Sequence, residues 1–159
     1  MNIQLIHTKN LRWIDIANPG EEEIKWLLNN FRFQETHLEA VAEHQHRPHI
    51  DLGTGYDFIV LLFPVYRPHS KEIAVGEVDF FIGDNFLITI HYSEIQTLKK
   101  FFSLAQSDSI VRNDSMQKGA GYLLFKILES LFRRSYPILD HISEDLEKIE
   151  KKIFSEGNI

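Results

Sequence analysis

The sequence predicts an α+β fold, with a mixed, largely antiparallel sheet flanked by helices and followed by long C-terminal helices. Three observations lead to this fold class. Strand-like segments recur up to His91, and the last two of them form a hairpin. Amphipathic segments with helical spacing interrupt the strands between residues 19 and 46. After His91 the apolar residues change from the period of a strand to the period of a helix.

The first elements are two short strands and a helix. Residues 2–8 alternate and end at a turn, and residues 11–16 alternate again. Asn18 is a favourable N-cap, Pro19 suits the first helical position, and glutamates fill the first turn. The apolar residues that follow recur at helical spacing, so we expect a helix over residues 19–30.

A second, shorter helix and two strands come next. Thr36 and Glu39 fit a capping box, in which the threonine caps the helix and the glutamate bonds back. Pro48 ends this helix because proline disfavours helical backbone in the residue before it. Residues 49–52 and 56–66 predict two strands around a Gly-Thr-Gly turn, and the second strand is apolar enough to be covered on both faces.

The clearest hairpin joins residues 77–82 to residues 86–91 through a Gly-Asp-Asn turn. Helical spacing follows over residues 93–104. Residues 106–115 are rich in Ser, Asp and Asn, so we expect a polar loop there.

A long apolar stripe begins near Gln117 and continues almost to the C-terminus. Pro137 interrupts this stripe, so we expect the helix to kink or to split in two. Beyond Pro137 charged residues surround a narrow stripe, which is typical of a helix that needs a partner helix, in this chain or in another copy. The stripe in this second part consists of Ile142, Leu146, Ile149 and Ile153.

Composition excludes several classes of protein. The chain has 159 residues, with 17 basic and 23 acidic side chains and a net charge of −6. We therefore expect no nucleic-acid partner, because such binding requires a dense basic patch. The absence of cysteine excludes disulfides and thiolate metal sites. The longest apolar stretch, residues 58–66, is far shorter than the ~20 residues of a membrane span, and no signal peptide or catalytic motif is present. We expect a soluble domain that is not an enzyme.

Imidazoles and carboxylates gather between residues 37 and 51. Such side chains bind Zn²⁺, Co²⁺ or Ni²⁺, and a pair of carboxylates can hold Mg²⁺ through water. Their spacing matches no established metal motif, and in the alternative interpretation the histidines are solvated or hydrogen-bonded and Glu39 is a helix cap. The cluster comprises His37, Glu39, Glu43, His44, His46, His49 and Asp51, of which His44, His46 and His49 are the candidate ligands for a soft metal.

The order of these segments resembles the cytoplasmic N-terminal domain of the CorA family of divalent-cation transporters. The most specific parts are the block LEAVAEHQHRP at residues 38–48, the strand pair that ends FLITIH, and the helix YLLF…LDHISEDLEKIE. These parts occur in the order and at the separations typical of the family, and the similarity extends from Trp13 to Phe154.

This resemblance implies an α/β/α sandwich over residues 1–112. A helical segment over residues 113–159, kinked near Pro137, would pack on the sandwich and lead towards a stalk and a membrane region that this chain lacks. In the family five copies assemble around a pore, with this domain on the cytoplasmic face of the plasma membrane. The Gly-Met-Asn tripeptide of the pore entrance is absent, so the chain would not conduct ions by itself.

The family senses intracellular Mg²⁺ at carboxylates between neighbouring subunits, and the resemblance implies this role for Glu39 and Glu129. Many members carry an aspartate where this chain has Ala40, and often an aspartate where it has Glu129. The implied function is a cytosolic regulatory domain of a Mg²⁺/Co²⁺ transporter. The histidines leave open the zinc-transporting branch of the same superfamily, with Zn²⁺ or Ni²⁺ as alternative ions. A stand-alone interaction module without metal is the third possibility.

Overall fold

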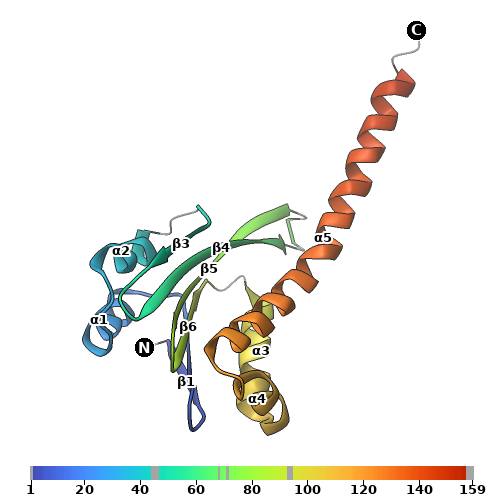
Figure 1. Ribbon diagram of the computed structural model, residues 1–159. Helices are drawn as coiled ribbons and strands as arrows, with labels where there is room; N and C mark the ends of the chain where they lie inside the picture. The colour runs from blue at the N-terminus through green and yellow to red at the C-terminus, as the bar shows by residue number, and fades with distance from the viewer. Residues whose placement is uncertain (1, 44–46, 68, 71, 93–94, 157–159) are drawn as a thin grey trace.

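A six-stranded sheet and five helices make up the described part of the chain (Figure 1). The computed structural model describes residues 2–43, 47–67, 69–70, 72–92 and 95–156. The strands are β1 (Ile3–His7), β2 (Arg12–Ala17), β3 (His49–Leu52), β4 (Tyr56–Arg67), β5 (Glu72–Gly83) and β6 (Phe86–His91). The helices are α1 (Glu21–Asn30), α2 (Glu35–Glu43), α3 (Gln96–Ser107), α4 (Ser109–Met116) and α5 (Ala120–Glu156).

The strands form one sheet in the order β1-β2-β6-β5-β4-β3. Strands β2 and β6 pair in parallel, with Ile14 opposite Ile88, whereas the other neighbours are antiparallel. Parallel neighbours need a long crossover, which the segment from α1 to β5 supplies. The mixed, largely antiparallel sheet expected from the sequence is confirmed, although β5 begins at Glu72 instead of residue 77.

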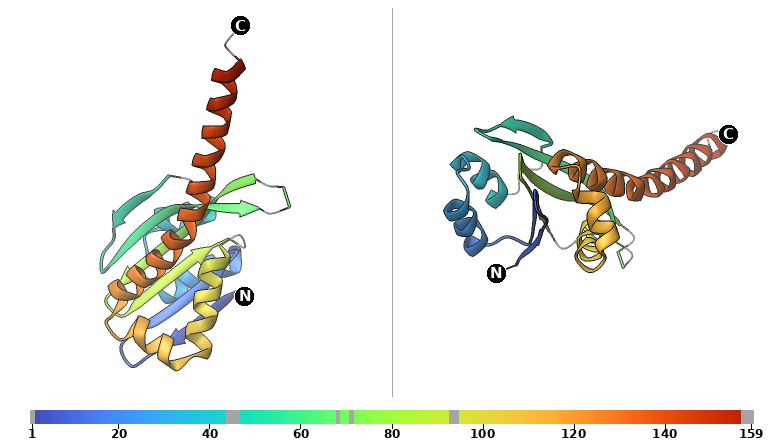
Figure 2. Two further views of the ribbon diagram at one scale, coloured as in Figure 1. Left: turned by 90° about the vertical axis from the view of Figure 1, so that its right-hand side faces the viewer. Right: turned by 60° about the horizontal axis from the view of Figure 1, so that its bottom comes forward.

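Helices cover both faces of the sheet (Figure 2). On one face α1 and α2 contribute Leu27 and Val41 to a core that also contains Phe58 of β4. On the other face α3 and α5 pack around Trp13 of β2, with Phe102 among the buried rings. Both faces of the central strands are therefore apolar, which explains the nearly continuous apolar runs in the sequence. The α/β/α sandwich is confirmed.

Helix α5 is one continuous helix of 37 residues with Pro137 inside it. Of the two effects expected at this proline, a kink or a split, the split does not occur, because the helix accommodates the proline at the loss of one main-chain hydrogen bond. The first half packs on the sheet, and the second half extends beyond the sandwich (Figure 1). None of the helices in the described ranges combines the length and apolar character that a membrane span requires.

The polar loop expected over residues 106–115 is largely a helix, α4. Asp108 caps it, with its side-chain oxygen accepting hydrogen bonds from the amides of Ile110 at 2.8 Å and Val111 at 3.4 Å. Its fully buried residues, Ser115 and Met116, lie in the last turn, and the partly buried Val111 also packs against the core. The helix buries few apolar side chains, so its apolar period is weak in the sequence.

Two helices begin at other residues than expected. Helix α1 begins at Glu21 with Gly20 as its N-cap, and Asn18 adopts a left-handed backbone with φ of 52°. Helix α2 begins at Glu35, which places Thr36 inside the helix instead of at its cap. The expected capping box of Thr36 is therefore wrong, because the preceding turn already supplies the first helical carbonyl from Gln34.

Candidate functional site

Glu39 lies on the solvent-exposed side of α2. Its neighbours Leu38, Ala40 and Val41 are buried against the sheet and fix the orientation of the helix. Ala40 is only 6% exposed and belongs to the core. The position at which many family members carry an aspartate thus serves packing in this chain, and Glu39 is the exposed carboxylate of the block.

Glu129 lies on an exposed side of α5, between the buried Ile127 and Leu131. Its Oε1 accepts a hydrogen bond from Nη2 of Arg133 at 3.2 Å, one helical turn further on. A shallow groove surrounds this ion pair, lined by Phe125, Leu128, Phe132 and Tyr136. A cation that bound Glu129 would therefore compete with Arg133.

The structure does not bring Glu39 and Glu129 together within one chain. Helix α2 packs on one face of the sheet and the first half of α5 on the other (Figure 2). A single cation could join the two carboxylates only if they came from different copies of the chain.

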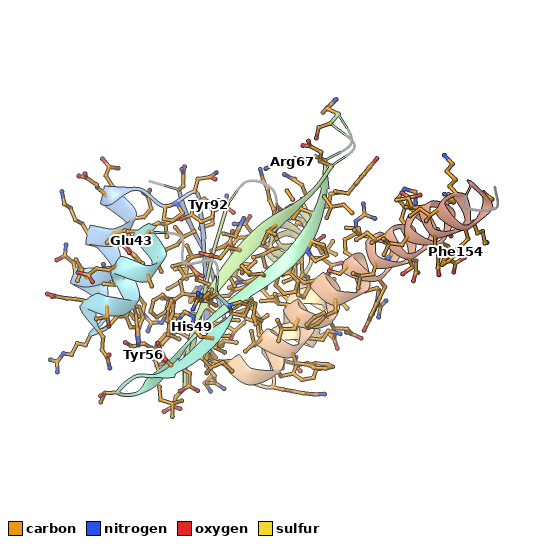
Figure 3. The ribbon with its side chains drawn as sticks, turned by 90° about the horizontal axis from the view of Figure 1, so that it is seen from above. Glu43, His49, Tyr56, Arg67, Tyr92 and Phe154 are labelled. Carbon is orange, nitrogen blue, oxygen red and sulfur yellow. The ribbon has the colours of Figure 1, made fainter. Side chains whose placement is uncertain are left out.

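Three members of the predicted histidine and carboxylate cluster lie together where α2 meets β3. Nε2 of His37 and Nε2 of His49 each lie 3.7 Å from Oδ2 of Asp51. Nδ1 of His37 shares a 2.8 Å hydrogen bond with the hydroxyl of Tyr56, which also accepts one from the amide of Gln34 at 2.9 Å. Figure 3 shows His49 and Tyr56 at this corner of the sheet.

The hydrogen bonds of His49 fix its tautomer. Its Nδ1 lies 2.7 Å from the carbonyl oxygen of Arg47, which can only accept, so Nδ1 carries a proton. When the ring is neutral, the lone pair of Nε2 therefore faces Asp51. Burial lowers the pKa of His37, and the nearby charge of Asp51 opposes this shift in part. His37 is consequently a neutral ring at neutral pH.

The remaining histidines of the cluster, His44 and His46, lie outside the described residues. Among the residues that are described, no three His, Asp or Glu side chains are positioned to hold a metal ion. A soft-metal site at His44, His46 and His49 stays a prediction. In the described structure His37 and Tyr56 connect α2 to the sheet.

A buried polar network connects β2 to β6, and the sequence pattern indicates the two strands but not the network. Oδ1 of Asp15 accepts a hydrogen bond from Thr89 at 2.5 Å, and Thr89 accepts one from the indole of Trp13 at 3.1 Å. Nε2 of His91 lies 3.2 Å from Oδ2 of Asp15, and its Nδ1 donates to the carbonyl of Tyr92 at 3.1 Å. Burial lowers the pKa of His91, but Asp15 and this carbonyl outweigh it and raise the pKa above its usual value. The ring is held as a cation.

A second buried polar feature on β5 was also missed by sequence reasoning. Glu77 is 5% exposed and Asp79 is 1% exposed. Burial, followed by the charge of Glu77, raises the pKa of Asp79 to about 8. Burial and these two carboxylates also raise the pKa of Tyr92. In the sequence the alternation of Glu77 and Asp79 with apolar residues resembles a strand with one solvent-exposed face, whereas helices cover both faces here.

The comparisons with known proteins agree with this fold. The soluble domain of CorA from Methanocaldococcus jannaschii superposes with a TM-score of 0.71 at 26% identity, covering 92% of this chain and 56% of that one. The cobalt/magnesium transport protein CorA of the same organism is 25% identical over 147 residues, which are 91% of this chain and 44% of that protein. The cytoplasmic domain of ZntB from Vibrio parahaemolyticus shares the fold, with a TM-score of 0.66 at 17% identity over 89% of this chain and 56% of that one.

The chain spans less than half of the length of the curated relatives that it matches, between 41% and 47%. The family model described as CorA-like Mg2+ transporter protein matches residues 8–158, which is nearly the whole chain. The protein belongs to the CorA-like family of Mg²⁺ transporter proteins.

Proposed function

We propose that this chain is the cytosolic, cation-sensing domain of a divalent-cation transporter. In this proposal Mg²⁺ or Co²⁺ bridges Glu39 of one copy and Glu129 of a neighbouring copy in a homopentamer. Residues 1–112 form the sensing sandwich, and residues 113–159 lead towards the stalk and membrane region of the whole transporter. The domain regulates transport at the cytoplasmic face of the plasma membrane, and it has no catalytic role and no nucleic-acid partner.

The observation that carries the proposal is the separation of the two carboxylates on opposite faces of the sheet. Both are exposed, and neither has an acidic neighbour in position to complete a site within the described chain. Carboxylate oxygens are the preferred protein ligands of Mg²⁺. A ring of copies would place the α2 side of one sandwich against the α5 side of the next.

Electrostatics then couples cation binding to assembly. The chain has a net charge of −6, so copies packed side by side repel one another. A divalent cation between two carboxylates removes part of this repulsion and favours the packed state. When the intracellular cation concentration is high, the bound cation holds the copies together and transport is closed. When the concentration falls, the cation leaves and the copies separate, so transport is regulated by negative feedback.

The proposal is tested by measuring thermal unfolding and sedimentation of the whole chain in Mg²⁺, Co²⁺ or chelator. We expect millimolar Mg²⁺ or Co²⁺ to raise the unfolding midpoint and to increase self-association. Glu39→Gln and Glu129→Gln should each remove most of both effects, because each deletes one charged ligand. Glu43→Gln is the matched control, since Glu43 is an exposed glutamate on the same helix as Glu39. Cation effects that are absent in the wild type, or unchanged in both variants, contradict the proposal.

A second candidate function is sensing in the zinc-transporting branch, and one observation favours it. Nδ1 of His49 donates to the carbonyl of Arg47, which leaves its Nε2 facing Asp51 at 3.7 Å, and Nε2 of His37 lies at the same distance from that carboxylate. Imidazole nitrogen favours Zn²⁺ or Ni²⁺ over Mg²⁺. If Zn²⁺ raises the midpoint at micromolar concentration and His49→Gln removes that shift, the zinc branch replaces the magnesium assignment. If Zn²⁺ has no effect beyond that of Mg²⁺, the zinc branch is excluded.

A further inference from the structure

Glu129, the ligand proposed on α5, lies between two basic side chains of the same helix. Lys126 precedes it by one helical turn and Arg133 follows it by one turn, so all three side chains share one side of α5. Nη2 of Arg133 donates to Oε1 of Glu129 at 3.2 Å. The charge of this ligand is therefore partly compensated from within its own chain.

The two basic side chains differ in how firmly they are held. Nζ of Lys126 lies 3.1 Å from Oδ2 of Asp114 on α4, and the Lys126 side chain is 27% exposed. The hydrogen bond with Asp114 raises the pKa of Lys126, and the charge of Glu129 adds a weaker contribution. Arg133, by contrast, has a side chain that is 78% exposed. Arg133 can therefore leave Glu129 for solvent with little loss of packing, whereas Lys126 stays at Asp114.

A cation that binds Glu129 enters by exchange with the guanidinium of Arg133. The two positive groups repel each other at one carboxylate, and Arg133 is held there at high effective concentration by the helix itself. Exposed ion pairs at this spacing are weak, so a divalent ion at millimolar concentration can displace the guanidinium. A divalent ion brings two positive charges in exchange for one, whereas K⁺ or Na⁺ brings only one. The exchange therefore strengthens the attraction to a pair of carboxylates only for a divalent ion.

We propose that Arg133 is a built-in competitor for Glu129, which sets the cation concentration at which the site between copies fills and excludes monovalent ions from it. This inference rests on the proposed function, because Glu129 is a ligand of that site. At a physiological ionic strength of about 0.15 M, monovalent ions compete with Mg²⁺ for a pair of exposed carboxylates. Arg133 occupies Glu129 against these ions and yields it to Mg²⁺ or Co²⁺.

The experiment follows self-association of the whole chain by sedimentation while Mg²⁺ is increased at constant ionic strength. The quantity compared is the association midpoint, which is the Mg²⁺ concentration at half-maximal association. Arg133→Gln should lower this midpoint about three- to tenfold, because one positive charge no longer competes for Glu129. Arg133→Lys should restore a midpoint within about twofold of the wild type, since a lysine at this spacing also pairs with the glutamate.

Arg134→Gln is the matched control, because it removes the same charge from the next residue of α5. Arg134 lies about 100° further round the helix and lines a different groove, beside Tyr66 and Ile73. This variant should shift the association midpoint much less than Arg133→Gln. If both variants lower the midpoint equally, net charge and not the ion pair with Glu129 determines it, and the proposal is wrong.

The monovalent ion is varied in the same titration, with KCl at about 0.15 M compared with choline chloride at the same concentration. The bulky choline ion cannot approach a pair of carboxylates as closely as K⁺. We expect the two titration curves to coincide for the wild type. For Arg133→Gln we expect a higher association midpoint in KCl than in choline chloride, because K⁺ now competes with Mg²⁺. Coincident curves for Arg133→Gln would overturn the proposal.

Glu129→Gln distinguishes the failure of this inference from the failure of the proposed function. If Mg²⁺ drives association that Glu129→Gln removes, but Arg133→Gln keeps the midpoint of the wild type, the sensing site is retained and the role of Arg133 is wrong. If Mg²⁺ drives no association in any of these proteins, the proposed function fails and this inference fails with it.

Discussion

At the scale of single residues, the two buried aspartates of the sheet differ in their hydrogen-bond partners. Asp15 receives bonds from Thr89 and His91, and it holds His91 as a cation. Asp79 is equally buried, but its Oδ1 has no partner and its pKa is raised to about 8. A buried carboxylate stays ionised only where donors or a cation surround it. The contacts of Asp15 with Thr89 and His91 therefore stabilise the parallel pair β2–β6, whereas Asp79 keeps its proton at neutral pH.

The ion pair of Asp15 and His91 predicts a pH-dependent effect of Asp15→Asn. His91 has a raised pKa in the fold, so its stabilisation is complete below the unfolded value of 6.5 and is lost as the pH rises through the folded value. Asp15→Asn leaves His91 buried without its counter-charge. We expect a loss of about 3 kcal/mol in the free energy of unfolding at about pH 6 and a smaller loss at about pH 9.

Urea-induced unfolding at these two pH values measures the difference. The titration of Asp79 is common to both proteins and cancels. An equal loss in the free energy of unfolding at both pH values would show that Asp15 stabilises the fold by packing and by its hydrogen bond with Thr89, and not by its charge.

At the scale of elements, the sequence predicts those segments whose apolar pattern and boundaries are both strong. The hairpin of β5 and β6 and the long helix α5 are examples, because their stripes contain many buried residues. Helix α4 was expected to be a loop, since it buries few apolar side chains and its start depends on the cap of Asp108. Pro137 was expected to be able to split α5, but a helix held by packing can absorb the loss of one bond.

The start of α1 shows how a distant contact sets a helix boundary. Oε2 of Glu23 accepts a hydrogen bond from the amide of Gly20 at 2.9 Å, and Oε1 accepts one from the amide of Asn2 at 2.7 Å. One buried carboxylate thus joins the N-cap of α1 to the segment before β1. The local sequence predicts Asn18 as the cap. It does not predict Gly20, because the contact of Glu23 with Asn2 depends on the strand pairing of β1 and β2.

Glu23→Gln tests this contact. The amide can accept with only one of its two terminal atoms, so we expect a loss of about 1 to 2 kcal/mol at neutral pH. The bond from Asn2, followed by that from Gly20, lowers the pKa of Glu23 in the fold. Its stabilisation is therefore present above the unfolded value of 4.5 and is lost as the pH falls through the folded value.

Thermal unfolding between about pH 3 and about pH 7 follows this effect. Glu21→Gln is the control on the same helix, because its ion pair with Lys25 is 3.8 Å long and highly exposed. A loss that is the same for both variants would contradict the assigned role of Glu23.

At the scale of the whole molecule, the sequence identified the candidate residues but not their spatial relation. The resemblance of local blocks implies Glu39 and Glu129 as candidates, whereas their position on opposite faces of the sheet follows only from the packing of α2 and α5. Of the histidine cluster, His37 and His49 meet at Asp51, a contact that depends on the docking of α2 beside β3. The pair of Glu77 and Asp79 was missed because burial of a strand on both faces is a tertiary property.

The second half of α5 predicts that stability and self-association can be separated. Leu146, Ile149 and Ile153 are 60%, 55% and 64% exposed, and this half extends away from the sandwich (Figure 1). Apolar residues at these spacings on an exposed helix favour pairing with another helix. The double variant Ile149→Glu/Ile153→Glu should therefore reduce self-association in sedimentation. Its unfolding midpoint in dilute solution should stay that of the wild type, because neither side chain contributes to the two cores of the sheet.

Lys152→Glu is the matched control, because it introduces negative charge at an exposed position beside the stripe. It should alter self-association much less than the double variant, since repulsion between surface charges is weak at physiological salt. If both variants reduce association equally, charge and not the apolar stripe determines it. If the double variant also lowers the midpoint of the monomer, the outer half of α5 is part of the folded core.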